Sequence, residues 1–575
     1  MSIAPQNSTL TTRTGWFQFI PAWIVGNFVA YFITSFFSTF YPLAYQFVVL
    51  SLLSQLLCGM AVFLLSSKTA HEVQAEKRVD LLGMLTLLLA FILSIWAVVI
   101  AWQFPGLFQR QILFMDAGRL PLFVLMSLIS LQGSIALLKT LEQNGVADRL
   151  KESRLFQFIQ TNLPGVLLAA FFLFTYFVFA ESINFPQFRT LDQYFDTDIS
   201  VWLQRLTSPR RADVSMVRAV HPAILLFFRP VVWFLSLFLH GDRLQAVFLM
   251  NALAGAGCVF LTWSIVKRAS GNTTYALMIA SLLGASASHL LLSSMFETYI
   301  YSALALLFFV LLMQNNKTAL KFTVPVGVII FGITVTNLIQ TCILYFVNHP
   351  RFKVIFKYVV LVVVLTALLN ILQVWLYPNA GSLFLPSDLL HEQRYIFNPF
   401  DFSWRSVGRF RLTLHAILLY GVVAPTPFIL MEEIGMDVPN FRTYQILLGE
   451  FHIAAYRGLA DITVKFWFII LAAAFLLFLL GLFKSPKQML LSLSLALCLG
   501  FSFVLHLVYG DDPLLYSANW TYALILFVAL VLQTWADRRW LQLLLIGFLI
   551  LLMSANLQLI HQIMDVSAPF YGTGN

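Results

Sequence analysis

Three aspartates stand close together in a polar stretch that follows an apolar segment: Asp192, Asp196 and Asp198. In an extended backbone, side chains two positions apart point to the same side of the chain, so Asp196 and Asp198 are expected to share a side. Two carboxylates placed in this way can hold a divalent metal, or one can accept a proton while the other orients it. The pattern predicts Asp198 and Asp196 as catalytic residues and Asp192 as a substrate-binding residue.

Two further polar positions stand at the starts of expected helices. A proline follows His221, and proline is favoured in the first turn of a helix. Glu297, two residues before Tyr299, is the only carboxylate between Asp242 and Asp388. A helix start favours a glutamate through the helix dipole, but an acid at membrane depth also indicates a functional site. We expect His221, Glu297 and Tyr299 to bind substrate.

A basic cluster lies in the long polar segment 377–462. Arginine presents a planar fork of donors that matches phosphate oxygens, so Arg394, Arg405 and Arg409 are expected to bind a phosphate group. Contact with lipid head groups is the alternative. The cluster consists of His391, Arg394, Arg405, Arg409, Arg411 and His415.

A short turn between two late apolar segments, Tyr509–Pro513, carries one more acid, Asp512. Glycine, aspartate and proline form turns on their own, which accounts for the motif without any function. Its place at the end of an apolar segment makes Asp512 a secondary substrate-binding candidate.

The composition indicates which elements must position these residues. Of 575 residues, 60% are hydrophobic and 11% are charged, whereas a soluble domain has about 25% charged residues. The chain is therefore expected to be an all-α polytopic membrane protein. The formal net charge of +9 is explained by basic cytoplasmic loops, so no nucleic-acid partner is expected.

The cysteines indicate neither a disulfide framework nor a zinc site. Cys58, Cys258, Cys342 and Cys498 lie far apart in apolar runs, without the spacing that metal ligands require. The first apolar run has no small-residue cleavage site after it, so we expect it to be retained as a helix.

Thirteen apolar segments are long enough to be expected as spans. They lie at about 16–37, 41–66, 81–103, 120–138, 164–181, 245–266, 274–293, 297–313, 354–376, 463–483, 489–508, 519–536 and 540–560. Residues 322–350 are expected to form two short helices with a turn near Thr336. The run 222–239 carries Arg229 and Pro230 at its centre, so it is expected to lie in the membrane interface.

With this assignment, the short basic turns all fall on one side of the membrane. By the positive-inside rule that side is cytoplasmic. The polar segments 182–244 and 377–462 then lie together on the non-cytoplasmic side, where loops on a rigid scaffold commonly carry function.

The order of these motifs resembles the GT-C superfamily, the glycosyltransferases that use polyprenyl-phosphate sugars, and within it the branch of protein O-mannosyltransferases and aminoarabinose transferases. The shared features are Asp196-Thr197-Asp198 after a spanning segment, His221-Pro222 opening a juxtamembrane helix, Lys267-Arg268 ending the next helix, and Glu297-Thr298-Tyr299 at a later helix start. Ala223 stands where the family has a second proline. The resemblance covers about residues 160–560.

The resemblance implies a GT-C-like helical bundle with outer-face loops and juxtamembrane helices. It implies an enzyme that moves a sugar from a polyprenyl phosphate to a hydroxyl of a glycan, lipid or protein acceptor, with inversion. The catalytic acid would be Asp196 or Asp198, and Glu297 would match an acid at a later helix start. Members differ in metal dependence, so a divalent metal held by Asp196 and Asp198 stays open. The implied location is a bacterial inner or plasma membrane, with the site on the outer face.

Two other functions remain as alternatives: a transporter or flippase of a polyprenyl-linked saccharide, and a structural subunit of an envelope complex. A transporter should carry charges in the middle of several spanning helices, whereas the acids here lie at segment ends. A structural subunit requires no paired acids. The sequence favours a catalytic region at 141–575, preceded by an extension at 1–140 with about four spans and no counterpart in the resemblance.

Overall fold

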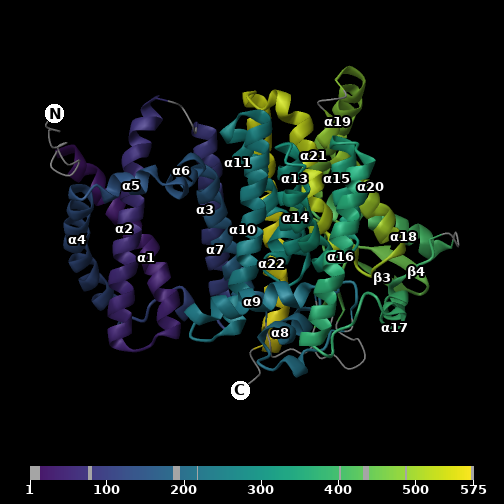
Figure 1. The fold of residues 1–575 in the computed structure, drawn as a ribbon, viewed down its shortest axis with the longest axis horizontal. Coiled ribbons are helices and arrows are strands. Elements are labelled where there is room, and N and C mark those ends of the chain that lie inside the picture. The colour runs from purple at the N-terminus through teal and green to yellow at the C-terminus, as the bar shows by residue number, and fades with distance from the viewer. Residues whose placement is uncertain are drawn as a thin grey trace. The chain divides into compact units, whose positions relative to one another are not determined.

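The fold is given by a computed structural model of residues 1–575, which describes residues 13–75, 80–184, 194–216, 218–399, 403–430, 439–485 and 489–571. Helices make up most of the described chain (Figure 1). Eleven of the described helices are long and apolar enough to cross a membrane. The expectation of an all-α polytopic membrane protein is confirmed. Asp192 lies outside the described residues.

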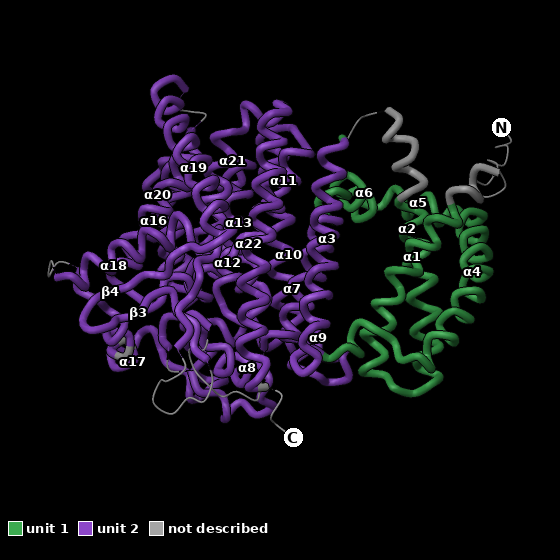
Figure 2. Tube along the Cα trace, turned by 180° about the vertical axis from the view of Figure 1, so that it is seen from behind, with its two compact units in different colours: residues 1–80, 109–166 green, residues 81–108, 167–575 purple. Residues whose placement is uncertain are grey.

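The chain divides into two compact units, which Figure 2 colours separately. Unit 1 contains residues 1–80 and 109–166, and unit 2 contains residues 81–108 and 167–575. The division does not coincide with the expected boundary at residue 140. Helix α3 (Leu81–Gln103) belongs to unit 2, where it packs against helices α11 and α22.

Unit 1 is built on three long helices, α1, α2 and α4. Helices α1 and α2 approach closely at two glycines, because a Cβ atom on Gly26 would lie 2.6 Å from the Cα of Gly59. The hydroxyl groups of Thr34 and Ser54 lie 2.6 Å apart across the same pair of helices. The helices of this unit are α1 (Arg13–Phe40), α2 (Ala44–Ala75), α4 (Leu120–Gln143), α5 (Val146–Glu152) and α6 (Arg154–Thr161).

Unit 2 is a bundle around α21 (Ala518–Leu532), in which every residue is buried. Helix α21 contacts helices on several sides, α10, α11, α13, α19 and α20 among them. The other long helices of unit 2 besides α3 are α7 (Leu163–Ile183), α10 (Arg243–Ser270), α16 (Phe352–Leu376), α19 (Leu459–Lys484), α20 (Leu490–Val508) and α22 (Arg539–Tyr571).

Two of the expected spans are shorter than the sequence indicates. The run 274–293 is interrupted at Ser286, which leaves the helical conformation and caps the next helix by accepting a hydrogen bond from the backbone N–H of His289. The result is α11 (Thr273–Ala285) followed by α12 (Ala287–Leu292). Helix α13 (Tyr299–Gln314) has 16 residues. These helices lie within the bundle, so their length need not match the bilayer.

Short helices form in the two segments that were not expected to be single spans. Residues 320–348 fold as α14 (Leu320–Ile333) and α15 (Asn337–Asn348), with the turn where the sequence predicts it. Helix α9 (Ile224–Phe238) has 15 residues and continues through Pro230. At 1.5 Å per residue it is about 22 Å long, which is too short for a span.

The polar segments also contain short helices and two small antiparallel sheets. The helices are α8 (Ile199–Thr207), α17 (Pro386–Leu390) and α18 (Trp404–His415). Strand β1 (Phe428–Leu430) pairs with β2 (Asn440–Arg442), and β3 (Tyr444–Leu447) pairs with β4 (Glu450–Ile453). Figure 1 shows α8, α9 and α17 at one end of the long helices of unit 2.

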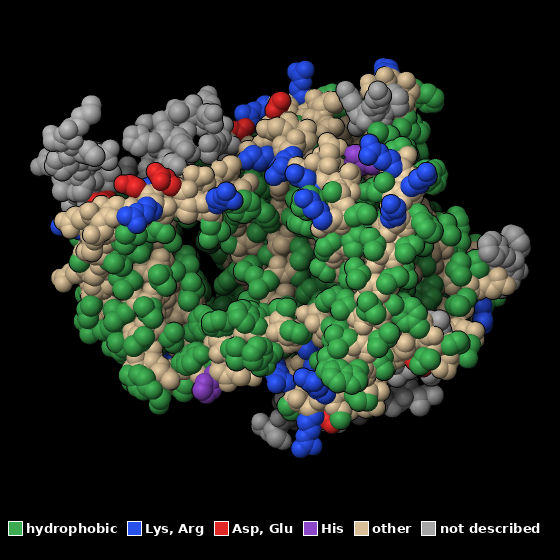
Figure 3. Space-filling view, viewed as in Figure 1, with side chains coloured by type: hydrophobic (Ala, Val, Ile, Leu, Met, Phe, Trp, Pro, Cys, Tyr) green, Lys and Arg blue, Asp and Glu red, His purple; other side chains and the backbone are tan. Residues whose placement is uncertain are grey.

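The basic turns of unit 2 gather at the opposite end. Arg268 donates to Asn315 at 2.9 Å, and Asn272 donates to Asp537 at 2.6 Å, which joins the ends of α10, α13 and α21. Figure 3 shows Lys and Arg side chains at both edges of the apolar surface of this unit. The basic turns that follow α10 and α13 thus meet at one end of the bundle.

The two polar segments pack against each other at their shared end. The backbone N–H of Met216 donates to the carbonyl of Asn379 at 3.0 Å, and the N–H of Gly381 donates to the carbonyl of Met216 at 2.6 Å. This end of unit 2, called the polar end below, contains the described candidate residues.

Candidate functional site

The acidic stretch of the first polar segment forms a tight turn. Phe195 and Asp196 have φ angles of 53° and 69°, in the left-handed region that non-glycine residues rarely adopt. The N–H of Thr197 closes the turn on the carbonyl of Tyr194, and the N–H of Phe195 donates to the carbonyl of Phe441 in β2 at 2.8 Å. Strand β2 therefore fixes the turn, and this kind of backbone strain is common at functional sites.

The turn separates the roles of Asp196 and Asp198. The segment is not extended, so the expectation that the two carboxylates share a side, which assumed extended backbone, does not hold. Asp196 instead forms an ion pair with Arg442 of β2, with 2.7 Å between Nη1 and Oδ1. Both side chains are 13% exposed, so the charge of Asp196 is largely neutralised by Arg442.

Asp198 precedes α8 and lies against Glu297. It occupies the N-cap position of α8, but its side chain makes no capping hydrogen bond. Its backbone N–H donates to Glu297 Oε1 at 2.6 Å, and the N–H of Thr298 donates to Glu297 Oε2 at 3.2 Å. Two acids 99 residues apart are thus joined, and the half-buried carboxylate of Asp198 is left for other partners.

Burial and the charge of Asp198 favour the protonated form of Glu297, whereas three arginines favour the ionised form of Asp198. Burial raises the pKa of Glu297 to about 8, and the nearby charge of Asp198 adds to the increase. Burial also raises the pKa of Asp198, while Arg205, Arg218 and Arg394 act in the opposite direction. Two interacting acids of this kind titrate as a pair, and such pairs are typical of sites that move protons.

The three arginines around Asp198 differ in what else they contact. Arg205 in α8 is buried, its Nε donates to the carbonyl of Ser215 at 2.8 Å, and its Nη1 has no hydrogen-bond partner among the described residues. Arg394 is exposed, and its guanidinium lies over the ring of Tyr395 at 4.8 Å. These two guanidinium groups retain donors for a negatively charged group near Asp198.

Arg218, in the first polar segment, connects it to the second polar segment and to the turn at Tyr509. Its Nε donates to Glu392 Oε1 at 2.8 Å and its Nη2 donates to the hydroxyl of Tyr509 at 2.8 Å. The hydroxyl of Tyr509 in turn donates to Glu392 Oε2 at 2.5 Å. The guanidinium of Arg218 also lies over the ring of Tyr395, 4.3 Å from its centroid. Arg218 therefore fixes the segment that carries Arg394 beside the acid pair.

His221 and Tyr299 lie in packed surroundings at the same end. Burial lowers the pKa of His221 to about 3, and the charge of Arg218 adds to the decrease. The neutral ring donates through Nδ1 to the carbonyl of Ile333 at 2.5 Å. Tyr299 packs edge-to-face against Tyr516, with 5.1 Å between ring centroids. These contacts join helix ends, so both residues stabilise the structure around the site.

Two other candidates are engaged in structural contacts. The buried guanidinium of Arg409 donates to four backbone carbonyls of residues 506–511, which leaves a structural role in place of the expected phosphate contact. Asp512 is fully buried and accepts from the N–H and hydroxyl of Thr443 at 2.7 and 2.6 Å. Arg405 is exposed, and its guanidinium lies over the ring of Trp404 at 5.1 Å.

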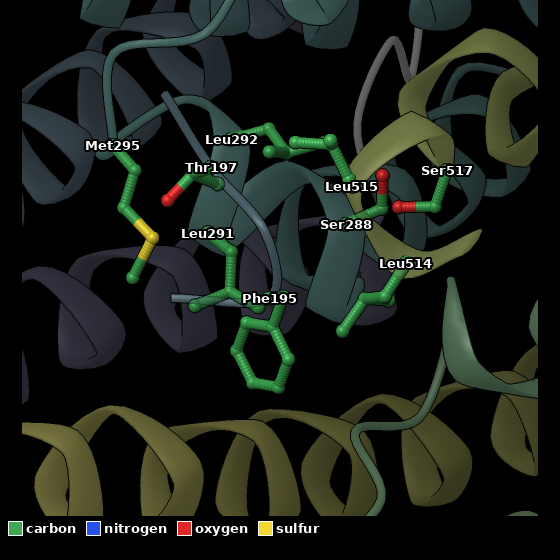
Figure 4. A pocket seen from close by; sticks show the side chains of 9 residues that line it. All are labelled: Phe195, Thr197, Ser288, Leu291, Leu292, Met295, Leu514, Leu515 and Ser517. Atoms are coloured by element: carbon green, nitrogen blue, oxygen red, sulfur yellow. The ribbon is translucent and has the colours of Figure 1, made fainter. Parts of the chain in front are cut away.

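A small cavity lies behind the turn, on the bundle side. Its volume of ≈10 Å³ has room for the centre of about one water molecule. Thr197, Ser288 and Ser517 are among the residues that line it, and their hydroxyl groups have no hydrogen-bond partner among the described residues. In Figure 4 the hydroxyls of Ser288 and Ser517 lie together on one side of the cavity, and Thr197 lies on the other. The cavity is too small for a sugar.

The geometry does not fit a divalent metal between Asp196 and Asp198. Asp196 is paired with Arg442, and the charges around Asp198 are those of arginines. Within the described ranges, the structure has no group of three His, Cys, Asp or Glu side chains that could hold a metal ion.

The sequence did not single out five polar residues that the fold places in the contacts of this end: Arg205, Arg218, Glu392, Arg442 and Tyr509. Two of them belong to the first polar segment. Basic residues are uncommon in short non-cytoplasmic loops, and this reasoning, which singled out the cluster at 391–415, applies equally to Arg205 and Arg218.

Comparison of the chain with protein-family models, with curated proteins and with solved structures found no match.

Proposed function

We propose that this protein is a membrane glycosyltransferase that moves a sugar from a polyprenyl-phosphate donor to an acceptor hydroxyl. One observation carries the proposal. The side chain of Asp198 makes no capping hydrogen bond, its backbone N–H donates to the buried acid Glu297, and the positive charges of Arg205, Arg218 and Arg394 favour its ionised form. An acid beside positive charge is what transfer from a phosphate requires, since a proton must be removed and an anion must depart.

In this mechanism Asp198 is the general base. It takes the proton of the acceptor hydroxyl as the acceptor oxygen bonds to the anomeric carbon. The bond from that carbon to the phosphate oxygen breaks, and polyprenyl phosphate leaves with the bonding electron pair. Direct displacement inverts the anomeric centre.

The arginines stabilise the departing phosphate. Arg394 is exposed and Arg205 retains a donor, so both can approach an anion beside Asp198. Because charge-assisted hydrogen bonds from arginine to phosphate are strong and directional, these groups stabilise the negative charge that develops on the leaving oxygen. Arg218 acts as a positioning residue, since its donors are engaged by Glu392 and Tyr509.

Glu297 controls the position and charge of the base. By accepting the backbone N–H of Asp198 it fixes the start of α8. A proton held on Glu297 avoids a second negative charge, and this favours the ionised, basic form of Asp198 near neutral pH.

The positive-inside rule supports a side of the membrane for the proposed site. The basic turns of unit 2 lie at the end opposite Asp198. By the positive-inside rule these turns are cytoplasmic, so the proposed site faces the non-cytoplasmic side, where a lipid-linked sugar is a suitable donor.

The proposal is tested with purified protein in liposomes that contain a fluorescent polyprenyl-phosphate sugar. A transferase consumes the donor and forms glycosylated product when a soluble acceptor is added. This result does not require the label to be distributed equally between the two leaflets. A flippase, the alternative hypothesis, moves the intact label between leaflets without consuming it. Translocation with no product in a panel of sugars and acceptors would refute the proposal.

A further inference from the structure

The hairpin β3–β4 ends in an unusual apolar tip. Its loop consists of Leu448 and Gly449, with φ angles of 52° and 86°, because Leu447 and Glu450 form the last strand pair. Hairpin loops with two positive φ angles favour asparagine or glycine at the first position. A leucine there is unfavourable for the backbone, so its presence indicates a role for its side chain.

The side chains at the tip are also exposed. Ile446, Leu447 and Leu448, called the hairpin tip below, are 48%, 50% and 105% exposed. In a water-facing loop, three consecutive exposed apolar residues are unfavourable. Adjacent exposed residues of this kind mark a site of contact with a partner or a membrane.

The hairpin is held firmly against α18. Phe451 stacks on Tyr444 with 5.1 Å between ring centroids and an interplanar angle of 2°. Gly408 of α18 makes room for this ring, because a Cβ atom at Gly408 would lie 2.4 Å from Cγ of Phe451. The tip therefore projects from a fixed base.

The surroundings point to lipid as the occupant. Helix α18 packs against α20, a candidate span. Its outer face exposes Trp404, Val407, Phe410 and Leu414, which share one side of the helix by their spacing. Figures 1 and 2 both show α18, β3 and β4 beside the spanning helices, within their length and not beyond their ends.

The charge of α18 agrees with an anionic lipid surface. Arg405 and Arg411 are exposed, and the sequence of this helix contains no acidic residue. Basic amphipathic helices with a tryptophan on the apolar face lie in the plane of the membrane interface.

We propose that the hairpin tip inserts among the acyl chains of the leaflet at the polar end, with α18 lying at the head groups beside it. This anchor holds the second polar segment against the bilayer and does not depend on the proposed transferase activity.

The test uses the full chain in nanodiscs of phosphatidylcholine and phosphatidylglycerol. Cys58, Cys258, Cys342 and Cys498 are replaced, and a single cysteine is introduced as Leu448→Cys and labelled with an environment-sensitive fluorophore. Ala212→Cys, at an exposed position of the same polar end, is the matched control. We expect blue-shifted emission and quenching by acyl-chain spin labels for position 448 only.

Three outcomes overturn the proposal: emission at position 448 like that of the control, quenching only by a water-soluble quencher, or blue-shifted emission that lipid labels do not quench. The last result would indicate that protein, such as a second copy of the chain, covers the tip.

A second variant needs no cysteine replacement. Leu448→Asn suits the turn better, so a water-facing tip predicts an unchanged or higher Tm in nanodiscs, whereas insertion predicts a lower Tm. His240→Asn is the control, because His240 is exposed and precedes Gly241 with almost the same angles, 52° and 87°. A rise in Tm for Leu448→Asn would contradict insertion.

Discussion

The stability of the Glu297→Gln variant relative to wild type should increase as pH rises. The folded state holds the Glu297 proton up to a pKa of about 8, whereas an ordinary glutamate has a pKa of 4.5. Between these values the folded state binds more protons than the unfolded chain, so wild-type stability falls as pH rises. Glutamine resembles the protonated acid and removes this dependence.

The expected size follows from the same pKa values. Each pKa unit corresponds to about 1.4 kcal/mol of unfolding free energy. Well above pH 8, where Glu297 is ionised in both states, the difference between 4.5 and about 8 therefore lowers the stability of the wild type by about 5 kcal/mol relative to low pH. From pH 5 to pH 8, Glu297→Gln should gain about 3 to 4 kcal/mol in unfolding free energy relative to wild type. Titrating groups that do not interact with Glu297 are common to both proteins and cancel in the difference, so the trend belongs to the pair of Glu297 and Asp198.

Thermal unfolding in nanodiscs, followed by tryptophan fluorescence at one scan rate, measures this difference. The Tm of Glu297→Gln minus that of wild type should increase steadily from pH 5 to pH 8. Glu152→Gln is the control, because this glutamate is exposed and belongs to unit 1. A constant Tm difference for Glu297→Gln would show that Glu297 is ionised at pH 7 and would refute the description of the acid pair.

Two arginine variants should separate binding from structure. Arg394→Ala should lower kcat/KM for the donor about 10- to 100-fold in initial-rate measurements, because a charge-assisted hydrogen bond contributes about 1.5–3 kcal/mol, while Tm stays unchanged since the side chain is exposed. A normal kcat/KM would remove Arg394 from the phosphate site. Arg409→Ala should lower stability by at least about 3 kcal/mol, because several buried carbonyls lose their donors. An unchanged Tm would contradict the structural role of Arg409.

The sequence predicts those features of the fold that depend on local signals. Apolar length and short basic turns locate most spans, and the central Arg229 and Pro230 identify α9 as a segment too short to cross. The break at Ser286 is harder to see, because the apolar run continues through it and only the capping hydrogen bond to His289 marks the new helix.

The site is only partly predictable, because its contacts join distant segments. The sequence identifies Asp198 and Glu297 separately, but their hydrogen bond spans 99 positions. No glycine marks the left-handed turn at Phe195 and Asp196, so the extended backbone was the reasonable expectation. Arg409 has the same residue type as Arg394, and only the fold shows that backbone carbonyls occupy its donors.

The most direct test of the central claim is acceptor-dependent release of labelled polyprenyl phosphate by the purified protein and by Asp198→Asn. Donors with different sugars are supplied, and the released lipid phosphate is separated by chromatography. We expect release by wild type and a loss of about 10²- to 10⁴-fold in Asp198→Asn, the range for removal of a general base. The Tm should stay nearly unchanged, because the side chain makes no capping hydrogen bond. Release by Asp198→Asn at the wild-type rate would contradict the account.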